Sequence, residues 1–149
     1  MAESLKVPAT LESLKAIREF VKAMASKGGV SEARSYGLAL AIDEIATNIA
    51  THAYEETGLT GDIVIIPTIT STAVEITVED SGAPFNPLLQ AEPRNLNAPL
   101  EERELGGLGI FLARKNVDEF RYTYTDGRNR NTFVIQLEPS ANSPADQQI

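Results

Sequence analysis

One run of the sequence places an acid and an amide at a spacing that can do chemistry. Residues 39–54 read ALAIDEIATNIATHAY, with Glu44 and Asn48 four positions apart. On a helix this spacing puts both side chains on one face. The carboxylate can then act as a base beside a carboxamide that binds a hard cation, since Mg²⁺ prefers oxygen ligands. The same pair is also common on the solvated flank of an amphipathic helix, so this helix alone does not decide.

A second candidate site is the sequence Asp80-Ser81-Gly82, which directly follows an alternating apolar stretch. A carboxylate at the end of a strand can accept a hydrogen bond from an exocyclic amine. The glycine beside it would let a flat ring approach the backbone closely. Asp-Ser-Gly is equally a common turn sequence.

A third candidate is the glycine cluster Gly106-Gly107-Leu108-Gly109. At the start of a helix, free backbone N–H groups and the helix dipole favour an anion such as a phosphate. The alternative is a flexible hinge followed by a helix start. No Gly-Lys-Ser/Thr follows, which excludes a Walker A loop, and no parallel βαβ unit surrounds the cluster, which excludes a Rossmann fingerprint.

Other polar residues carry weaker indications. His52 is expected to pack against or cap the end of its helix rather than to bind a ligand. Arg94 and Arg103 can reach phosphates from the loop that contains them, although single loop arginines are usually only solvated.

The surrounding patterns predict the elements that position these residues. Apolar residues at helical spacing predict helices that start after Thr10 and Ser31, end at Gly28 and near Glu56, and recur at 106–116. Strands are expected at 4–7, 63–70 (with Pro67 at an edge or bulge), 73–78, 120–124 and 132–137, with an Asp126-Gly127 hairpin turn.

This order predicts an α/β (α+β) fold. Adjacent hairpins favour a mixed, mainly antiparallel sheet with the helices on one face, which is a two-layer sandwich. The other face of the sheet would be partly available for self-association. Residues 1–138 are expected to form one domain, with the proline-rich stretch 83–105 as a lid. The polar tail 139–149 is expected to be disordered.

Composition excludes several classes of protein. The 149 residues contain no Cys and one His, so disulfides, thiolate metal sites and a multi-histidine zinc site within one chain are excluded. The net charge of −8 argues against non-specific nucleic-acid binding. No apolar run reaches membrane-spanning length and no secretory signal pattern is present, so a cytoplasmic protein without membrane association is expected.

Taken in order, the three motifs resemble the N box and the two glycine boxes of the GHKL (Bergerat-fold) ATPases. The segments DEIATN (43–48), HAY (52–54), DSGAPFNP (80–87) and GLGIFL (107–112), with Asp118 after them, resemble the anti-sigma factor serine kinase branch. The resemblance extends from Leu5 to Leu137. One departure is Pro84, which stands where many members of the superfamily have a second glycine; this branch commonly shows the same change.

The resemblance implies a role for each matching residue. Glu44 would be the general base and Asn48 the ligand of a Mg²⁺ ion that bridges the phosphates of ATP. The expected nucleotide contacts are Asp80 with the adenine amino group, Gly82 and Ala83 beside the ring, Gly106, Gly107, Leu108 and Gly109 around the phosphates, and Thr132 near the adenine. Such a site fits phosphoryl transfer, which mostly needs positioning and charge neutralisation.

The implied function is that of a serine/threonine-protein kinase and anti-sigma regulatory factor. It would phosphorylate a STAS-domain anti-sigma antagonist, sequester a sigma factor and form a homodimer through its sheet. An alternative is a nucleotide-dependent binding module without kinase activity, acting with a serine phosphatase; Glu44 argues against it, since a pure binder needs no base. A structural domain without nucleotide would require three ordered motifs to arise by chance.

Overall fold

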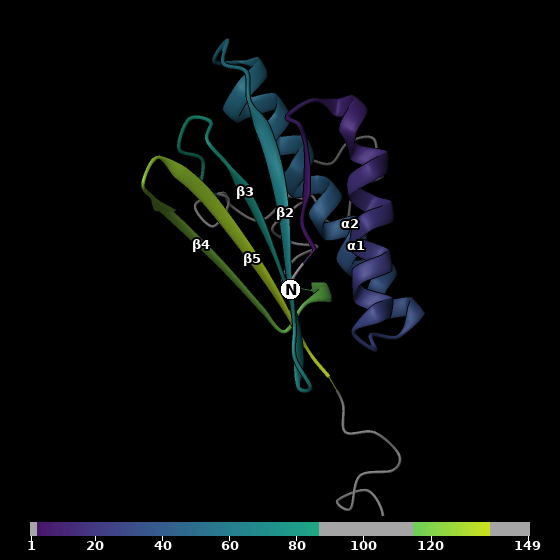
Figure 1. Cartoon of the computed structure of the whole chain (residues 1–149). Coiled ribbons are helices and arrows are strands. Elements are labelled where there is room, and N and C mark those ends of the chain that lie inside the picture. Colours follow the sequence, from purple (N-terminus) through teal and green to yellow (C-terminus); the bar gives the residue numbers. More distant parts are fainter. Residues whose placement is uncertain (1–2, 87–114, 138–149) are drawn as a thin grey trace, which may run out of the picture.

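The computed structural model of the chain describes residues 3–86 and 115–137 (Figure 1). Its elements are β1 (Leu5–Pro8), η1 (Leu11–Ser13), α1 (Leu14–Lys27), α2 (Glu32–Asn48), η2 (Ile49–Glu55), β2 (Asp62–Ile69), β3 (Ala73–Asp80), β4 (Glu119–Thr125) and β5 (Arg128–Gln136). The predicted order of elements is confirmed for this part of the chain. Most of the predicted lid, nearly all of the 106–116 helix and the tail lie outside the described residues.

The five strands form one sheet in the order β1-β2-β3-β5-β4. Every pairing among the described strands is antiparallel, so the parallel contribution implied by a mixed sheet is not found there. The β4–β5 hairpin turns at Asp126 and Gly127, whose φ values of 55° and 73° are both left-handed, as the predicted hairpin turn requires. This hairpin places the start of β5 beside the end of β3.

Helices α1 and α2 lie together on one side of this sheet, which confirms the predicted two-layer arrangement (Figure 1). Along β3, Val74, Ile76 and Val78 are fully buried, whereas the residues between them are only half-buried. The core against which they pack includes the helix residues Ile17, Val21, Leu38, Ile42 and Ile45. Asp80 continues the buried face of β3, so the fold carries a carboxylate to the edge of its own core.

Pro67, which has no backbone N–H, lies at a position of β2 where the sheet does not need that donor. Strand β2 is second in the sheet, but β1 pairs only with the segment from Asp62 to Ile65. Pro67 lies beyond that segment and pairs only on the β3 side, opposite Ile76. The predicted edge position is therefore local to this end of β2, where a missing N–H costs no ladder bond.

The sequence predicted the N-terminal cap of α2 correctly, but not that of α1. Ser31 caps α2 as expected, because its Oγ accepts from the Arg34 backbone N–H at 3.3 Å. The side chain of Thr10 makes no such cap, and the short 3₁₀ segment η1 precedes α1. Leu11, the first residue after Thr10, lies in η1 and is 48% exposed.

The far end of the long helix also differs from the prediction of one continuous helix to about Glu56. Helix α2 ends at Asn48, and the chain continues as the π-helical segment η2, which places the Glu56 N–H 2.9 Å from the Thr51 carbonyl oxygen. π-Helical turns are rare and are often found at functional sites. The wider turn shifts the side chains that follow Asn48 relative to an α-helical register.

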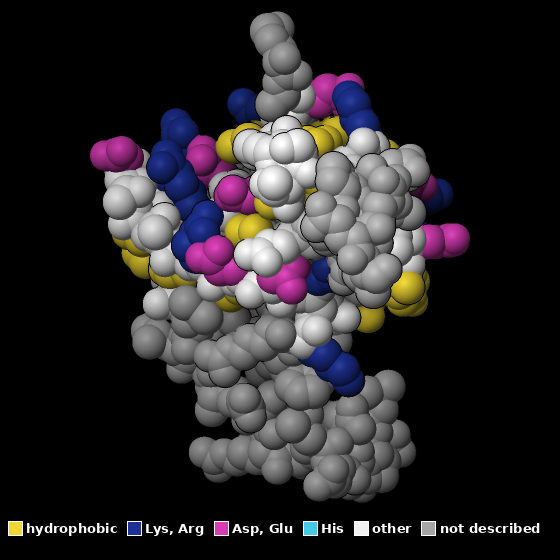
Figure 2. All heavy atoms as spheres, turned by 90° about the horizontal axis from the view of Figure 1, so that it is seen from below, with side chains coloured by type: hydrophobic (Ala, Val, Ile, Leu, Met, Phe, Trp, Pro, Cys, Tyr) yellow, Lys and Arg dark blue, Asp and Glu magenta, His cyan; other side chains and the backbone are white. Residues whose placement is uncertain are grey.

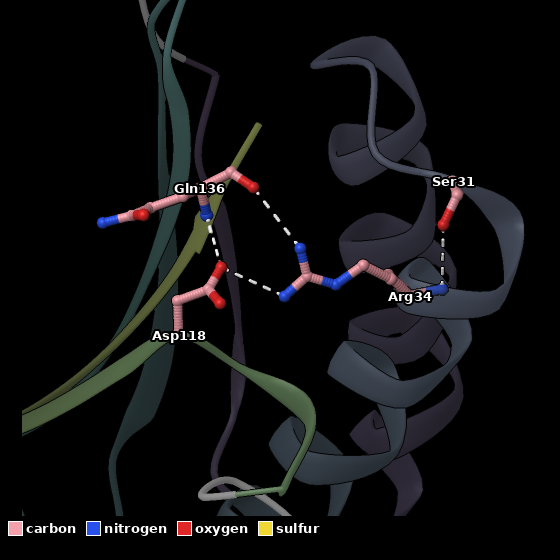
Figure 3. Close-up of polar contacts among 4 residues, drawn as sticks. All are labelled: Ser31, Arg34, Asp118 and Gln136. Atoms are coloured by element: carbon pink, nitrogen blue, oxygen red, sulfur yellow. Dashed lines mark hydrogen bonds and ion pairs between the residues drawn. The ribbon is translucent and has the colours of Figure 1, made fainter. Parts of the chain in front are cut away.

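A polar cluster connects the start of α2 to Asp118, which directly precedes β4, and to Gln136 at the end of β5 (Figure 3). The Arg34 guanidinium donates to Asp118 Oδ2 at 3.0 Å and to the Gln136 carbonyl oxygen at 3.3 Å. Asp118 Oδ2 also accepts from the Gln136 N–H at 2.7 Å. These contacts fix the helix layer against the sheet at the end of α2 remote from Asn48.

No helix within residues 3–86 and 115–137 combines the length and the apolar character that a membrane span needs. Figure 2 shows one face of the molecule, on which acidic and basic side chains are interspersed rather than gathered by sign.

Candidate functional site

Asp80 is the most unusual polar residue of the sheet. It is only 2% exposed, and its Oδ2 accepts from the Gly82 N–H at 2.9 Å and from Asn129 Nδ2 at 3.1 Å. Its Oδ1 is buried without a hydrogen-bond partner among the described residues. Burial raises the pKa of Asp80, and the Glu79 charge adds to the rise, although the Gly82 N–H, the Asn129 amide and the Tyr54 hydroxyl oppose it. A buried acceptor without a donor is costly, and a ligand N–H at this position would satisfy it.

Asn129 holds the loop that follows Asp80. It lies opposite Asp80 in the β3–β5 pairing and is 1% exposed. Its Nδ2 also donates to the carbonyl oxygens of Gly82 (3.4 Å) and Ala83 (3.0 Å), while its Oδ1 accepts from the Phe85 N–H (3.1 Å) and from the Tyr122 hydroxyl. The backbone of this loop is therefore fixed from the neighbouring strand.

Segment η2 holds the same loop from the helix side. The Tyr54 hydroxyl accepts from the Ser81 N–H at 2.8 Å, and the Ala53 carbonyl oxygen accepts from the Ala83 N–H at 3.3 Å. A Cβ on Gly82 would lie 2.8 Å from the Ala53 oxygen and 2.9 Å from Tyr54 Cε2. Gly82 is thus required for the close contact between the loop and η2, a reason that the sequence alone does not show.

His52 packs at this junction as predicted. Its ring stacks on Phe85, with the ring centroids 5.2 Å apart, and its Nδ1 lies 2.8 Å from Glu56 Oε1. The stack joins η2 to the loop after Asp80 at a third point. His52 therefore supports the loop through packing.

Glu44 and Asn48 lie on the last turns of α2. They precede the η2 residues that contact the loop by four to ten positions in the sequence. Glu44 is half-buried; burial raises the pKa of its carboxyl, and the neighbouring Asp43 charge raises it further. Asn48 is 7% exposed, and its Nδ2 has no hydrogen-bond partner in the described part of the chain. A carboxyl with a raised pKa suits a general base, and the carboxamide oxygen of Asn48 is of the ligand type that Mg²⁺ prefers.

The structure does not bring Thr132 to this cluster. Side chains alternate along β5, and Thr132 falls on the face of the sheet away from the helices, where its hydroxyl lies 3.1 Å from the Thr77 hydroxyl. Asp80 is on the opposite face. The expected contact of the Thr132 side chain with the ring therefore does not fit this register, because one position along a strand reverses the face.

Asn131, rather than Thr132, shares the face of Asp80. It is 1% exposed, and its Oδ1 is buried without a partner among residues 3–86 and 115–137. Sequence reasoning missed both Asn129 and Asn131. The signal was present, because strand alternation groups these two with the apolar Phe133 and Ile135, and amides on a core-facing stripe are unusual.

Of the remaining expected site residues, Ala83 lies in the loop held by Asn129 and Ala53. Gly106, Gly107, Leu108 and Gly109 lie outside the described residues, as do Arg94 and Arg103. The described part of the site therefore consists of the end of α2, η2, the loop after Asp80, and the start of β5.

Comparison with known proteins identifies the class to which this arrangement belongs. Residues 7–135 match the family described as the histidine kinase-like ATPase domain, and the chain belongs to that family. The resemblance inferred from the three motifs is thereby confirmed. The match covers α2, the Asp80 loop and β5 together.

Within the family, the chain is similar to proteins named serine-protein kinase RsbW. It is 31% identical to the one from Bacillus mycoides and 30% identical to one from Bacillus cereus, in each case over 142 residues, or 93% of this chain and 88% of the relative. A crystal structure of the RsbU and RsbW domains of Rv1364c from Mycobacterium tuberculosis matches with a TM-score of 0.61 at 18% identity. That match covers 93% of this chain and 34% of the other, and it supports the fold.

Proposed function

We propose that the chain is an ATP-dependent protein kinase that phosphorylates serine or threonine on a protein partner. The observation that carries the proposal is the buried Oδ1 of Asp80, an acceptor without a donor among the described residues, at the end of β3 beside a loop fixed on both sides. The 6-amino group of adenine is a donor of the size and geometry that such an acceptor takes. The names of the Bacillus relatives support the kinase activity.

The end of α2 would act on the phosphates. The carboxamide oxygen of Asn48 would bind Mg²⁺, which usually takes only one or two protein ligands and completes its shell with phosphate oxygens and water. Bound there, the ion would neutralise charge on the transferring phosphoryl group. Glu44 would accept the proton of the attacking hydroxyl, since its raised pKa favours proton uptake. Gly106, Gly107, Leu108 and Gly109 remain proposed phosphate contacts, and the segment 83–105 a proposed lid.

The proposed partners follow from the same class. The substrate would be a STAS-domain antagonist of an anti-sigma factor, and the kinase would also sequester a sigma factor in the cytoplasm. The alternative is a system that ends in a serine phosphatase rather than a sigma factor. We also propose a homodimer through the sheet face away from the helices, where the half-buried apolar residues Val64 and Ile66 lie on β2 beside the strand that contributes Glu79 and Glu75 to ion pairs.

The test is a calorimetric titration of the full chain with ADP or ATP and Mg²⁺, run alongside Asp80→Asn. The mutant keeps an oxygen for the Gly82 and Asn129 donors but presents an amide N–H where Oδ1 accepts. We expect its affinity to fall by about tenfold to a hundredfold, the value of a hydrogen bond to a charged group. Equal affinity in the mutant would refute the adenine contact, and no binding by the parent would refute the nucleotide site.

A further inference from the structure

The Asn129 side chain connects the buried carboxylate of Asp80 to the whole loop behind it. It uses both ends of its carboxamide: Nδ2 donates to Asp80 Oδ2 and to the Gly82 and Ala83 carbonyl oxygens, and Oδ1 accepts from Phe85 and Tyr122. Because the Phe85 N–H is a donor and the two carbonyls are acceptors, only this orientation of the amide satisfies the loop.

This network decides which oxygen of Asp80 is free. A rotatable carboxylate in a cavity could present either oxygen to a ligand, or turn to satisfy both within the protein. Here the Gly82 N–H and Asn129 Nδ2 both bind Oδ2, at 2.9 and 3.1 Å, so the buried Oδ1 is left without a donor. Holding that orientation before a ligand arrives removes an ordering cost from binding.

We propose that Asn129 is the positioning residue for recognition of the purine amino group. It fixes Asp80 so that Oδ1 is the free acceptor, and it fixes residues 82–85 as the edge against which the ring lies. This inference rests on the proposed nucleotide function and adds a residue to it. Asn129 does not touch the ligand; it acts through Asp80 and the loop backbone.

An amide is needed at this position because a donor and an acceptor are required in one buried side chain. Aspartate at 129 would keep the oxygen that accepts from Phe85, but it could donate to Asp80 only while protonated. Two carboxyl groups this close share one proton, and the pair is strained once both ionise.

The charged and titratable groups around this pair come from four elements. They are Glu79 on β3, Tyr54 on η2, Tyr122 on β4, and Arg128 and Arg130 on β5 itself. Both arginines bind the Glu79 carboxylate on the opposite face of the sheet, at 2.8 and 3.0 Å. The groups on the Asp80 face are therefore the two tyrosine hydroxyls, which titrate far above neutral pH.

The experiment measures ADP affinity with Mg²⁺ by calorimetry at about pH 5.5 and about pH 8. The variants are Asn129→Leu, which is similar in size and lacks both polar ends, and Asn129→Asp. The control is Thr123→Val, an exposed residue of β4 paired with Arg130. Amide hydrogen exchange at Phe85 without nucleotide reports the loop separately, and circular dichroism confirms folding.

We expect Asn129→Leu to bind ADP about tenfold more weakly than the parent at both pH values. Asn129→Asp should be about tenfold weaker near pH 8 and should recover toward the parent near pH 5.5, where the shared proton restores the donor. The control should stay within about twofold of the parent, since an exposed threonine contributes little. Exchange at Phe85 should be faster in Asn129→Leu and unchanged in the control.

Two results would overturn the role of Asn129 alone: parent-like affinity in Asn129→Leu, or a loss in Asn129→Asp that is the same at both pH values. If Asn129→Leu does not fold, the pH dependence of Asn129→Asp decides. A parent that binds no ADP at either pH would instead overturn the nucleotide function, and the positioning role with it.

Discussion

The polar groups at the two ends of helix α2 differ in whether they have hydrogen-bond partners. At the start, the Ser31 hydroxyl, the Arg34 guanidinium and the Asp118 Oδ2 all have partners (Figure 3). At the other end, Asn48 Nδ2 is buried without one, as is the Oδ1 of Asp80 at the end of β3, within the part of the chain that the structure describes. The same helix thus begins in a satisfied cluster and ends in an unsatisfied one.

The two aspartates at these ends show what the difference means. The Gln136 N–H and the Arg34 guanidinium lower the pKa of Asp118, which is partly exposed and so keeps most of its hydration. Asp80 also accepts two hydrogen bonds, yet its pKa is raised, because burial outweighs them. Hydrogen bonds stabilise the carboxylate in both places, and the difference in burial decides the sign.

This contrast separates polar groups that are paired within the fold from groups that are not. Paired groups at the start of α2 contribute to stability, whereas a buried polar atom without a protein partner costs stability that a bound ligand or an ordered water would return. Substitutions at one end of α2 at a time test this difference.

The largest effect is expected at the unsatisfied end, for Glu44→Gln. Loss of the proposed base should slow phosphoryl transfer from ATP to the protein substrate, and with it ADP formation, by roughly 10²- to 10⁴-fold, with little change in ATP affinity, because the amide keeps the size of the side chain. Rates are measured by coupled assay and affinity by calorimetry. The exposed Glu55→Gln serves as the control. Equal rates in Glu44→Gln and the parent would remove Glu44 from the base role.

A smaller effect is expected at the satisfied end, for Asp118→Ala. We expect the free energy of unfolding in urea to fall by about 1–2 kcal/mol, since one partly exposed carboxylate with two hydrogen bonds is lost. As a control, Arg121→Ala on the exposed sheet face should cost under about 0.5 kcal/mol, as surface ion pairs usually do.

The effect of Asp118→Ala should depend on pH. The folded pKa of Asp118 is lowered, so its contribution is present above the unfolded pKa of about 3.9 and is lost as the pH falls through the folded value. The destabilisation should therefore be largest near neutral pH and smallest in acid. A loss that is constant with pH would contradict the role of the charge.

For Asp80→Asn without nucleotide, we expect the smallest change in the free energy of unfolding. Its pH dependence should be opposite to that of Asp118→Ala. A raised folded pKa means that the folded parent holds the extra proton, so its stability falls as the pH rises from the unfolded value through the folded one. The variant does not titrate there. Its stability relative to the parent should rise with pH over that window, in urea titrations at several pH values. A flat difference would mean that burial does not strain Asp80.

Much of the fold could be predicted from sequence because it follows local rules. The Ser31 cap, the Asp126-Gly127 turn, and the alternation of Val74, Ile76 and Val78 each depend on neighbours in the chain. The same holds for Glu44 and Asn48, whose spacing sets a shared helix face whatever surrounds them.

Tertiary structure decided what depends on contact between distant segments. The 3₁₀ segment η1 before α1 and the π-helical segment η2 after α2 are departures from α-helical geometry that the apolar periodicity does not predict. The faces of Thr132 and Asn131 follow from strand register, which a shift of one residue reverses.

The acid at 80 could be found from its motif, but its free oxygen could not. That oxygen is defined by Asn129, 49 residues further along the chain, and by burial that only the assembled sheet and η2 provide. Residue types and their local spacing are enough to identify the groups that can act as base, metal ligand or hydrogen-bond acceptor. The tertiary structure decided which of their atoms are left unpaired to do it, because hydrogen bonding and desolvation depend on neighbours in space.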